Sequence, residues 1–157
     1  MSKKIIIAGE ESAFHLKEKL VKFMEEKGYD FTDATSTPTM TYMEVGSVVG
    51  KAVSSGEYEL GVVVCGSGMG VNLVANRYSG VYCGLVESYD TAKMARTITN
   101  CNVLAMGGNV VAYDLACRML EVFVETEFTE GFGKEKAETL QGYFKQMKEL
   151  DSSLHTS

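Results

Sequence analysis

The chain has 157 residues, a length typical of one domain with a sizeable hydrophobic core. Asp and Glu number 21 against 15 Lys and Arg, which gives a formal net charge of −6. This acidic balance, without a cluster of basic residues, argues against a surface for nucleic acid or anionic lipid. No apolar run is long enough to span a membrane. We therefore expect neither nucleic acid nor membrane among the partners.

The cysteines and histidines are too few and too dispersed for a metal site. The cysteines stand at positions 65, 83, 101 and 117, none in a CxxC pair, and there are only two histidines. This pattern disfavours zinc, and we expect no metal and no cofactor. The N-terminal stretch lacks the long apolar segment of a signal peptide. We expect a cytoplasmic protein with reduced thiols.

Hydrophobic periodicity predicts an alternation of buried strands and amphipathic helices. The predicted strands are residues 4–8, 29–34, 60–65, 81–86 and 103–106. The predicted helices are residues 11–27, 42–54, 71–77, 89–97, 112–125 and 134–150. In the first helix, Lys17 is assigned to the solvated side. The alternation favours a three-layer α/β fold, a Rossmann-like parallel sheet of about five strands with helices on both faces.

The end of the chain is expected to differ from the rest. Residues 1–150 are predicted to form a single domain, and residues 151–157 a flexible tail. No strand follows the last helix, so this helix is expected to extend from the body as an arm that packs on a second subunit.

Residues 61–70, with the sequence GVVVCGSGMG, join a buried strand to a helix through a glycine-rich turn. Cys65 occupies the last strand position, and the turn collects backbone N–H groups at a helix N-terminus, which suits an anion. The end of a parallel strand is also where open α/β sheets place their chemistry. An isolated cysteine in a strand is also explained simply as a buried core residue. The pattern alone therefore leaves open whether Cys65 belongs to a reactive site or only to the core.

Three loops are expected on the same edge of the sheet, because right-handed crossovers bring the carboxyl ends of the strands together. They span residues 9–13, 66–70 and 87–89, and they carry Glu10, Glu11 and Ser88 as candidate substrate-binding residues. The two glutamates also have a simpler explanation, since acidic side chains favour a helix N-terminus.

The CGSGMG segment that begins at Cys65, with Asn76 and Gly80 after it, resembles the CGTGxG…NK…G segment of the type B ribose-5-phosphate isomerases. The same family includes the two subunits of galactose-6-phosphate isomerase. Tyr42 falls where the family carries the tyrosine of its DYP motif, and residues 91–108 are similar to its segment ending NVLAxG. The resemblance covers roughly residues 3–130.

The resemblance implies isomerisation of a sugar phosphate through an enediolate, with Cys65 as the base that moves a proton between neighbouring carbons. The glycine loop would stabilise the Cys65 thiolate, and Tyr42 would bind a sugar hydroxyl. The implied substrates are ribose-5-phosphate, galactose-6-phosphate or a shorter tetrose or tetrulose phosphate. The implied oxyanion hole consists of Ser67 and the N–H groups of Gly66, Gly68, Met69 and Gly70.

The sequence departs from the family at the groups that open the sugar ring. The family loop SDHAG reads GEESA at residues 9–13, so that Glu10 and Glu11 replace the acid and the histidine, as in one galactose-6-phosphate isomerase subunit. The ring-opening histidine aligns with Ile98, which cannot transfer a proton. Thr99 and Asn100 follow it and are expected to contact substrate.

The phosphate-binding arginines of the family segment GGRHxxR are also missing. Lys134 and Lys136 stand there, as point charges without the bidentate arginine fork or as part of a solvated helix face. These departures fit a short, open-chain substrate, or an oligomer whose partner supplies the missing groups. We expect a homodimer or tetramer with a shared active site, with a hetero-oligomer as the other possibility.

Two other functions stay open beside the isomerase. The first is a non-catalytic sugar-phosphate-binding or regulatory subunit of a hetero-oligomeric isomerase, suggested by the missing histidines. The second is a nucleotide- or flavin-binding domain, which the absence of a GxGxxG pattern disfavours.

Overall fold

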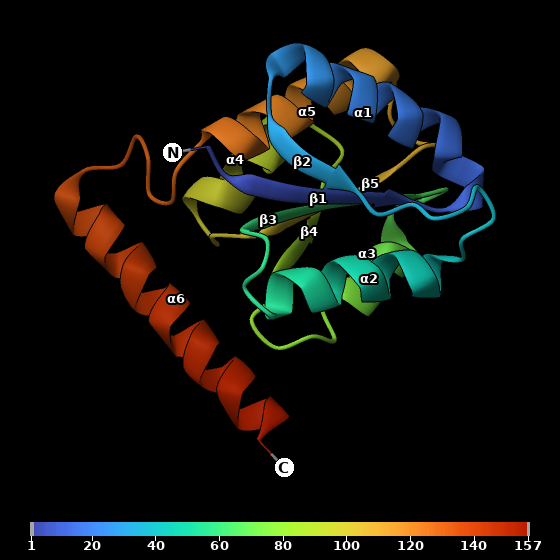
Figure 1. The fold of residues 1–157 in the computed structure, drawn as a ribbon. Helices are drawn as coiled ribbons and strands as arrows, with labels where there is room; N and C mark the ends of the chain where they lie inside the picture. The colour runs from blue at the N-terminus through green and yellow to red at the C-terminus, as the bar shows by residue number, and fades with distance from the viewer. Residues whose placement is uncertain (1, 157) are drawn as a thin grey trace.

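A parallel five-stranded sheet forms the centre of the structure, a computed structural model that describes residues 2–156 (Figure 1). The strands are β1 (Lys4–Gly9), β2 (Asp30–Asp33), β3 (Leu60–Cys65), β4 (Cys83–Leu85) and β5 (Val103–Gly107). Their order is β2-β1-β3-β5-β4. All of β3 is buried, and its register with β5 pairs Cys65 with Gly107. The strand that carries the predicted catalytic cysteine is therefore the middle strand of the sheet.

The chain forms six α-helices, five of which cover the two faces of this sheet within the described residues. They are α1 (Phe14–Lys27), α2 (Tyr42–Ser54), α3 (Met69–Ala75), α4 (Tyr89–Thr97), α5 (Tyr113–Glu125) and α6 (Lys134–His155), with a short 3-10 turn at Glu11–Ala13. Helices α1, α4 and α5 lie on one face, and α2 and α3 lie on the other (Figure 1). The predicted three-layer Rossmann-like α/β fold is confirmed.

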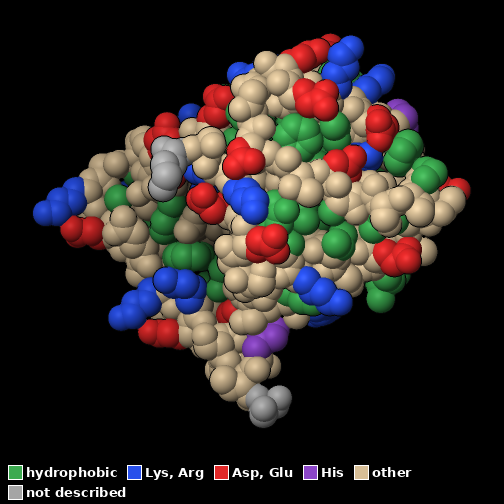
Figure 2. Space-filling model, viewed as in Figure 1, with side chains coloured by type: hydrophobic (Ala, Val, Ile, Leu, Met, Phe, Trp, Pro, Cys, Tyr) green, Lys and Arg blue, Asp and Glu red, His purple; other side chains and the backbone are tan. Residues whose placement is uncertain are grey.

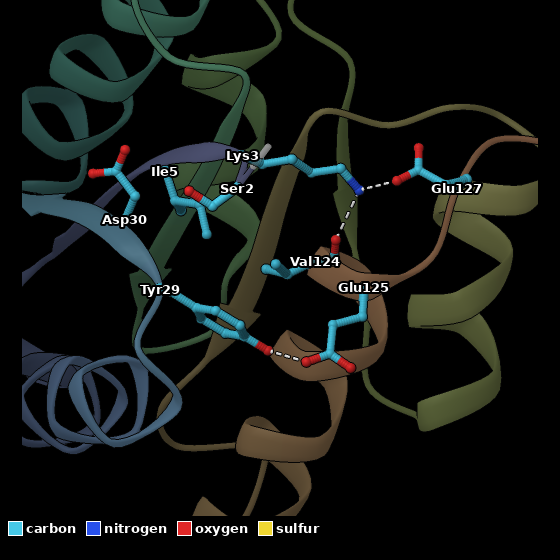
Figure 3. A pocket seen from close by; sticks show the side chains of 8 residues that line it. All are labelled: Ser2, Lys3, Ile5, Tyr29, Asp30, Val124, Glu125 and Glu127. Atoms are coloured by element: carbon cyan, nitrogen blue, oxygen red, sulfur yellow. Dashed lines mark hydrogen bonds and ion pairs between the residues drawn. The ribbon is translucent and has the colours of Figure 1, made fainter.

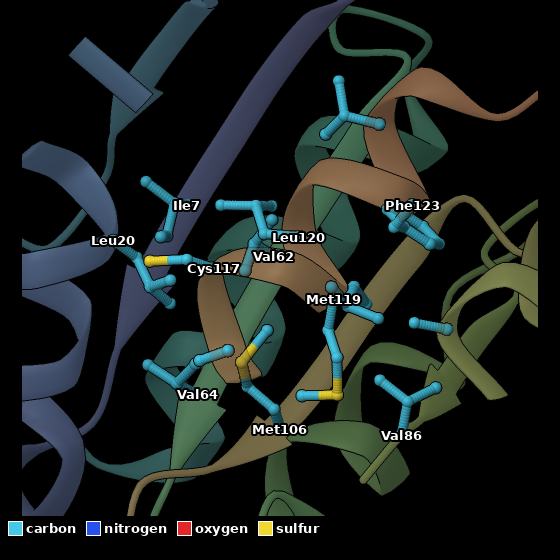
Figure 4. Close-up of a cluster of buried hydrophobic side chains, with 14 of the residues drawn as sticks. Ile7, Leu20, Val62, Val64, Val86, Met106, Cys117, Met119, Leu120 and Phe123 are labelled. Atoms are coloured by element: carbon cyan, nitrogen blue, oxygen red, sulfur yellow. The ribbon is translucent and has the colours of Figure 1, made fainter. Parts of the chain in front are cut away.

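Side chains of β3 alternate between two hydrophobic cores, as the period of a strand requires. Val62 and Val64 face the larger core, where Leu120 and Phe123 of α5 pack against the sheet (Figure 4). Val63 and Cys65 belong to the core under α2 and α3. Because of this alternation, the Cys65 side chain faces the layer formed by α2 and α3. Helix α2 begins at Tyr42, and α3 begins within the glycine-rich turn.

Several boundaries differ from the sequence prediction because turn geometry intervenes. The first helix is preceded by the 3-10 turn, in which the Glu10 side chain accepts a hydrogen bond from the N–H of Ser12. Helix α3 begins at Met69, directly after Gly68, whose φ of 77° places it in the left-handed region that glycine favours. Strand β4 is limited to residues 83–85.

The prediction that Lys17 lies on the solvated side of α1 is wrong. Lys17 faces the sheet and is only 1% exposed. Its Nζ forms ion pairs with Asp33 at 2.7 Å and with Glu18. The partner in β2 explains the error, because a contact 16 residues away in sequence leaves no trace in the helical pattern.

Helix α6 continues to His155, so residues 151–155 are helical instead of the flexible tail predicted for 151–157; residue 157 lies outside the described residues. Contacts with the body hold this end. The Asp151 carboxylate accepts hydrogen bonds from the N–H of Gly80 at 2.7 Å and from the Ser79 hydroxyl at 3.0 Å. Phe144 packs edge-on against Tyr82 at a centroid distance of 5.3 Å. The helix forms an arm beside the sheet (Figure 1).

The surface carries mixed charge. Figure 2 shows acidic and basic side chains interspersed over the viewed face. Within residues 2–156, no helix combines the length and the apolar character needed to cross a bilayer.

Candidate active site

Several of the predicted site residues meet in a cavity of about 430 Å³. It lies beyond the carboxyl ends of β1 and β3, where α2 also begins. The lining residues are Glu10, Ser12, Tyr42, Cys65, Gly66, Ser67 and Gly70. The cavity thus joins the first loop, the tyrosine and the glycine-rich turn, three segments far apart in the sequence.

Cys65 lies in the wall of this cavity, with 5% of its surface exposed. Its Sγ accepts a hydrogen bond from the N–H of Gly68 at 3.2 Å. Its carbonyl accepts one from the N–H of Gly108 at 2.9 Å, which fixes the end of the strand. The Gly68 peptide therefore directs the positive end of its dipole at the sulfur.

The glycine-rich turn is packed against β5 without spare room. A Cβ atom on Gly107 would lie 2.6 Å from the backbone carbon of Ser67. Within the turn, the Ser67 hydroxyl accepts a hydrogen bond from the N–H of Met69 at 3.2 Å. Two of the amides expected in the oxyanion hole, those of Gly68 and Met69, thus already have an internal acceptor. A substrate oxygen would compete with these acceptors.

Tyr42 forms another wall of the cavity. It is the first residue of α2, whose N-terminus is fixed by a capping box between Thr41 and Glu44. The ring lies against Gly70, where an added Cβ would come within 2.7 Å of it. The Met69 side chain is exposed and does not line this cavity.

The first loop contributes a carboxylate and a hydroxyl. The N–H of Glu10 donates to the carbonyl of Val64 at 2.9 Å, which ties the loop to the centre of the sheet. The Glu10 carboxylate accepts hydrogen bonds from the N–H of Ser12 at 3.1 Å and from its hydroxyl. This pair places two polar groups beside Gly66 in the cavity.

The sequence prediction named neither Ser12, which lines the cavity, nor Asn109, which supports Gly66 from outside it. Both contact Gly66: a Cβ there would lie 2.8 Å from the Ser12 Oγ and 3.1 Å from the Asn109 Nδ2. Asn109 also donates its N–H to the carbonyl of Gly66 at 3.0 Å. Neither has a clear local signal. The Glu10 side chain accepts the backbone N–H two residues on, whichever side chain stands there, and Asn109 reaches Gly66 only because the end of β5 lies beside the end of β3.

The cavity is acidic. Glu10 supplies a carboxylate, and no Lys or Arg is found among the residues that line the cavity. A phosphate placed here would meet like charge without a compensating cation. Across residues 2–156, no three His, Cys, Asp or Glu side chains are grouped in a way that could hold a metal ion.

Two other predicted residues lie near this edge of the sheet but outside the cavity. Glu11 is exposed in the 3-10 turn, where its N–H donates to the carbonyl of Met40 at 3.2 Å. Ser88 caps the N-terminus of α4 and lines a separate cavity of about 340 Å³ together with Glu87.

The remaining predicted residues lie at the opposite edge of the sheet, where the strands begin. Thr99 and Asn100 follow α4 and lead into the start of β5, and the Thr99 hydroxyl donates to the carbonyl of Ala95 at 3.0 Å. Lys134 and Lys136 begin α6, which leaves the body at that edge (Figure 1). One chain alone does not bring these four residues to Cys65.

Another cavity, of about 300 Å³, lies at this opposite edge (Figure 3). Its polar groups pair with one another. The Lys3 Nζ donates to the carbonyl of Val124 at 2.9 Å and pairs with Glu127 at 2.6 Å, while the Tyr29 hydroxyl donates to Glu125 at 2.7 Å. Burial, with the Glu125 hydrogen bond, raises the pKa of Tyr29, so the phenol stays protonated. These contacts join the N-terminal strand to the end of α5, and none of the predicted site residues lines this cavity. The Cys65 cavity, which collects several of them, is therefore the candidate active site.

A sequence model of the family described as Ribose/Galactose Isomerase matches residues 5–140. The chain belongs to this family. It is 35% identical to the 4-deoxy-4-sulfo-D-erythrose isomerase of Clostridium sp. (strain MSTE9), over 97% of this chain and 98% of that one. It is 28% identical to the D-erythrulose-4-phosphate isomerase of Pectobacterium atrosepticum, over 92% of this chain and 96% of that one.

The fold agrees with the family. The ribose-5-phosphate isomerase B of Clostridium thermocellum has a TM-score of 0.86 with 28% identity, covering 96% of this chain and 99% of that one. The predicted resemblance is confirmed, and with it the assignment of the chain to the sugar-phosphate aldose–ketose isomerases.

Proposed function

We propose that the chain interconverts the aldose and ketose forms of a four-carbon sugar with an anionic group on its last carbon, with Cys65 as the base. The observation that carries this proposal is the Cys65 thiol in the cavity wall, with the Gly68 N–H directed at its sulfur. Two relatives support the short substrate, because they are named as isomerases of a sulfo-erythrose and of erythrulose-4-phosphate.

In the proposed reaction, the Cys65 thiolate removes the proton from the carbon beside the carbonyl. The electron pair of that C–H bond forms the enediolate double bond, and the carbonyl oxygen takes the negative charge. Amides of the glycine-rich turn stabilise this oxygen. A proton then passes from the hydroxyl oxygen on the first carbon to the former carbonyl oxygen on its neighbour. The Cys65 thiol returns its own proton to that former carbonyl carbon as the new C=O bond forms on the first, so no redox partner is needed. The Glu10 and Ser12 pair, which lines the same cavity as Cys65, would bind the sugar hydroxyls at these carbons.

The chemistry of a four-carbon substrate explains why the ring-opening histidine is missing. A sugar closes a five-membered ring through the hydroxyl on its fourth carbon. When that carbon carries phosphate or sulfonate, the hydroxyl is absent and the sugar stays open. Ile98 at the end of α4 therefore costs such an enzyme nothing, although it would disable one that acts on a cyclic pentose or hexose phosphate.

We further propose a homodimer in which the second copy completes the anion site. Helix α6 exposes an apolar stripe of Tyr143, Met147, Leu150 and Leu154, whose spacing places them on one helical face. Met43 and Leu73 expose another apolar surface beside Tyr42 on α2 and α3. Apolar patches of this kind mark protein interfaces. A second copy would supply the missing cation through Lys134 or Lys136, or polar contacts through Thr99 and Asn100.

The decisive experiment incubates the purified chain in D₂O with four-, five- and six-carbon aldose and ketose phosphates and with 4-deoxy-4-sulfo-erythrose. Proton NMR then follows exchange at the carbon beside the carbonyl, and light scattering reports the number of subunits. We expect exchange with the four-carbon sugars and a dimer. Thermal stabilisation by these sugars without any exchange would contradict the isomerase and favour the binding subunit. Exchange only with a five- or six-carbon sugar would contradict the short substrate.

A further inference from the structure

Lys17 is a buried cation that no step of the proposed reaction uses. It lies on the sheet side of α1, and its side chain pairs with Asp33 and Glu18. Burial lowers the pKa of Lys17, but the hydrogen bonds and charges of Asp33 and Glu18 outweigh burial and raise it. Lys17 is therefore charged at neutral pH. Asp33 and Glu18 are partly exposed, and ion pairs with exposed carboxylates add little stability, so the buried ammonium calls for another explanation.

A chain of contacts leads from Lys17 to the active-site loop. One oxygen of Asp33 accepts the Lys17 ammonium, and the other accepts the N–H of Thr35 at 2.9 Å. The Thr35 hydroxyl in turn accepts the N–H of Gly9 at 3.1 Å. Gly9 is the last residue of β1, and Glu10, which lines the cavity, follows it directly.

Lys17 also touches Gly9 through its aliphatic stem. A Cβ on Gly9 would lie 2.5 Å from the Lys17 Cβ and 2.8 Å from its Cγ, so the stem lies directly against the backbone there. The stem of Lys17 and the hydroxyl of Thr35 therefore both contact the backbone of Gly9. The Asp33 carboxylate links these two contacts, because it accepts both the Lys17 ammonium and the N–H of Thr35.

We infer that Lys17 and Thr35 are positioning residues that fix the backbone at Gly9 and thereby aim the Glu10 carboxylate and the Ser12 hydroxyl at the substrate. This inference rests on the proposed function. Neither Lys17 nor Thr35 lines the cavity, so both act through the loop. Small displacements matter in such a site, because a misplacement of about 1 Å can lower the rate about 100-fold.

The test compares Lys17→Met and Thr35→Val with the control Lys22→Met, which removes an exposed lysine from the same helix. Lys17→Met keeps the apolar stem and removes the charge, whereas Thr35→Val keeps the ion pair and removes the acceptor for Gly9. We expect kcat/KM to fall ~10- to 100-fold in both variants, mainly through kcat, with the control unchanged. Lys17→Arg, which restores the cation, should recover part of the loss.

Amide hydrogen exchange at Gly9 and Glu10 supplies a readout that does not depend on turnover. We expect faster exchange there in Lys17→Met and Thr35→Val and parent-like exchange in Lys22→Met. The inference would be overturned if the variants melted at a lower temperature but kept the kcat and KM of the parent. Unchanged amide hydrogen exchange at Gly9 and Glu10 would also overturn it. If Lys17→Met does not fold, Thr35→Val decides the matter. A parent chain that turns over no sugar refutes the proposed function itself, and the exchange result still shows whether the anchoring of Gly9 is wrong.

Discussion

Gly107 of β5 offers a direct way to displace the glycine-rich turn that follows Cys65. Gly107 pairs with Cys65 in the sheet, and a Cβ there would lie 2.6 Å from the backbone carbon and 2.7 Å from the carbonyl oxygen of Ser67. An ordinary contact begins near 3.4 Å, so Gly107→Ala must push the loop away by about 0.8 Å. No flexible side chain absorbs this movement, because the atoms concerned belong to the backbone.

We expect Gly107→Ala to lower the free energy of unfolding by about 1–3 kcal/mol, the usual cost of overpacking. The displaced loop should lower kcat/KM about 100-fold. The assays are urea denaturation and initial rates with the sugar that the parent turns over. Gly142→Ala is the matched control, since nothing lies within 4 Å of its Cβ and alanine suits a helix better than glycine. A Gly107→Ala variant with full activity per folded molecule would refute this account of the loop.

The remaining predictions concern the tyrosine, the lysines and the arm. Tyr42→Phe keeps the ring against Gly70, so kcat/KM should fall by no more than about tenfold in initial-rate assays, the value of one hydrogen bond. Replacing Lys134 and Lys136 by alanine should raise KM for the anionic sugar with little change in melting temperature, and an unchanged KM would assign both to a solvated face. Both ring nitrogens of His155 face carbonyl oxygens, those of Asp151 at 2.9 Å and Arg77 at 3.1 Å. These backbone hydrogen bonds raise the pKa of His155 above 6.5. The parent should therefore melt above His155→Gln below about pH 6.5, and the difference should disappear as the pH rises through the folded pKa, in thermal scans across this range. A difference that does not vary with pH would contradict a protonated His155.

The part of the site that follows from local sequence was predictable. An apolar run that ends in Cys65 and a glycine-rich turn specify a buried strand, a tight turn and a helix start with neighbouring residues alone. A family motif predicted Tyr42 as a site residue. In the structure, Tyr42 lines the cavity and its ring contacts Gly70 of the glycine-rich turn. The order of the strands brings these two segments together, and the alternation of strands and helices was enough to predict that fold.

What could not be predicted depends on contacts between distant segments. Lys17 looks like a surface residue until β2 brings Asp33 to it, and Asn109 reaches Gly66 only because β5 lies beside β3. The end of α6 is helical because Asp151 finds the N–H of Gly80, 71 residues earlier in the chain. Charge patterns and spacing along the sequence do not contain this information.

In the proposed reaction, the Cys65 thiol moves the substrate proton. The most direct measurement is the rate of deuterium incorporation beside the carbonyl of a four-carbon sugar in D₂O, for the parent, Cys65→Ala and the control Cys117→Ala, which alters a buried thiol on α5. We expect Cys65→Ala to fold and bind the sugar but to incorporate no deuterium above the uncatalysed rate, while Cys117→Ala exchanges like the parent per folded molecule. A folded Cys65→Ala that exchanges at the parent rate would contradict this role of Cys65.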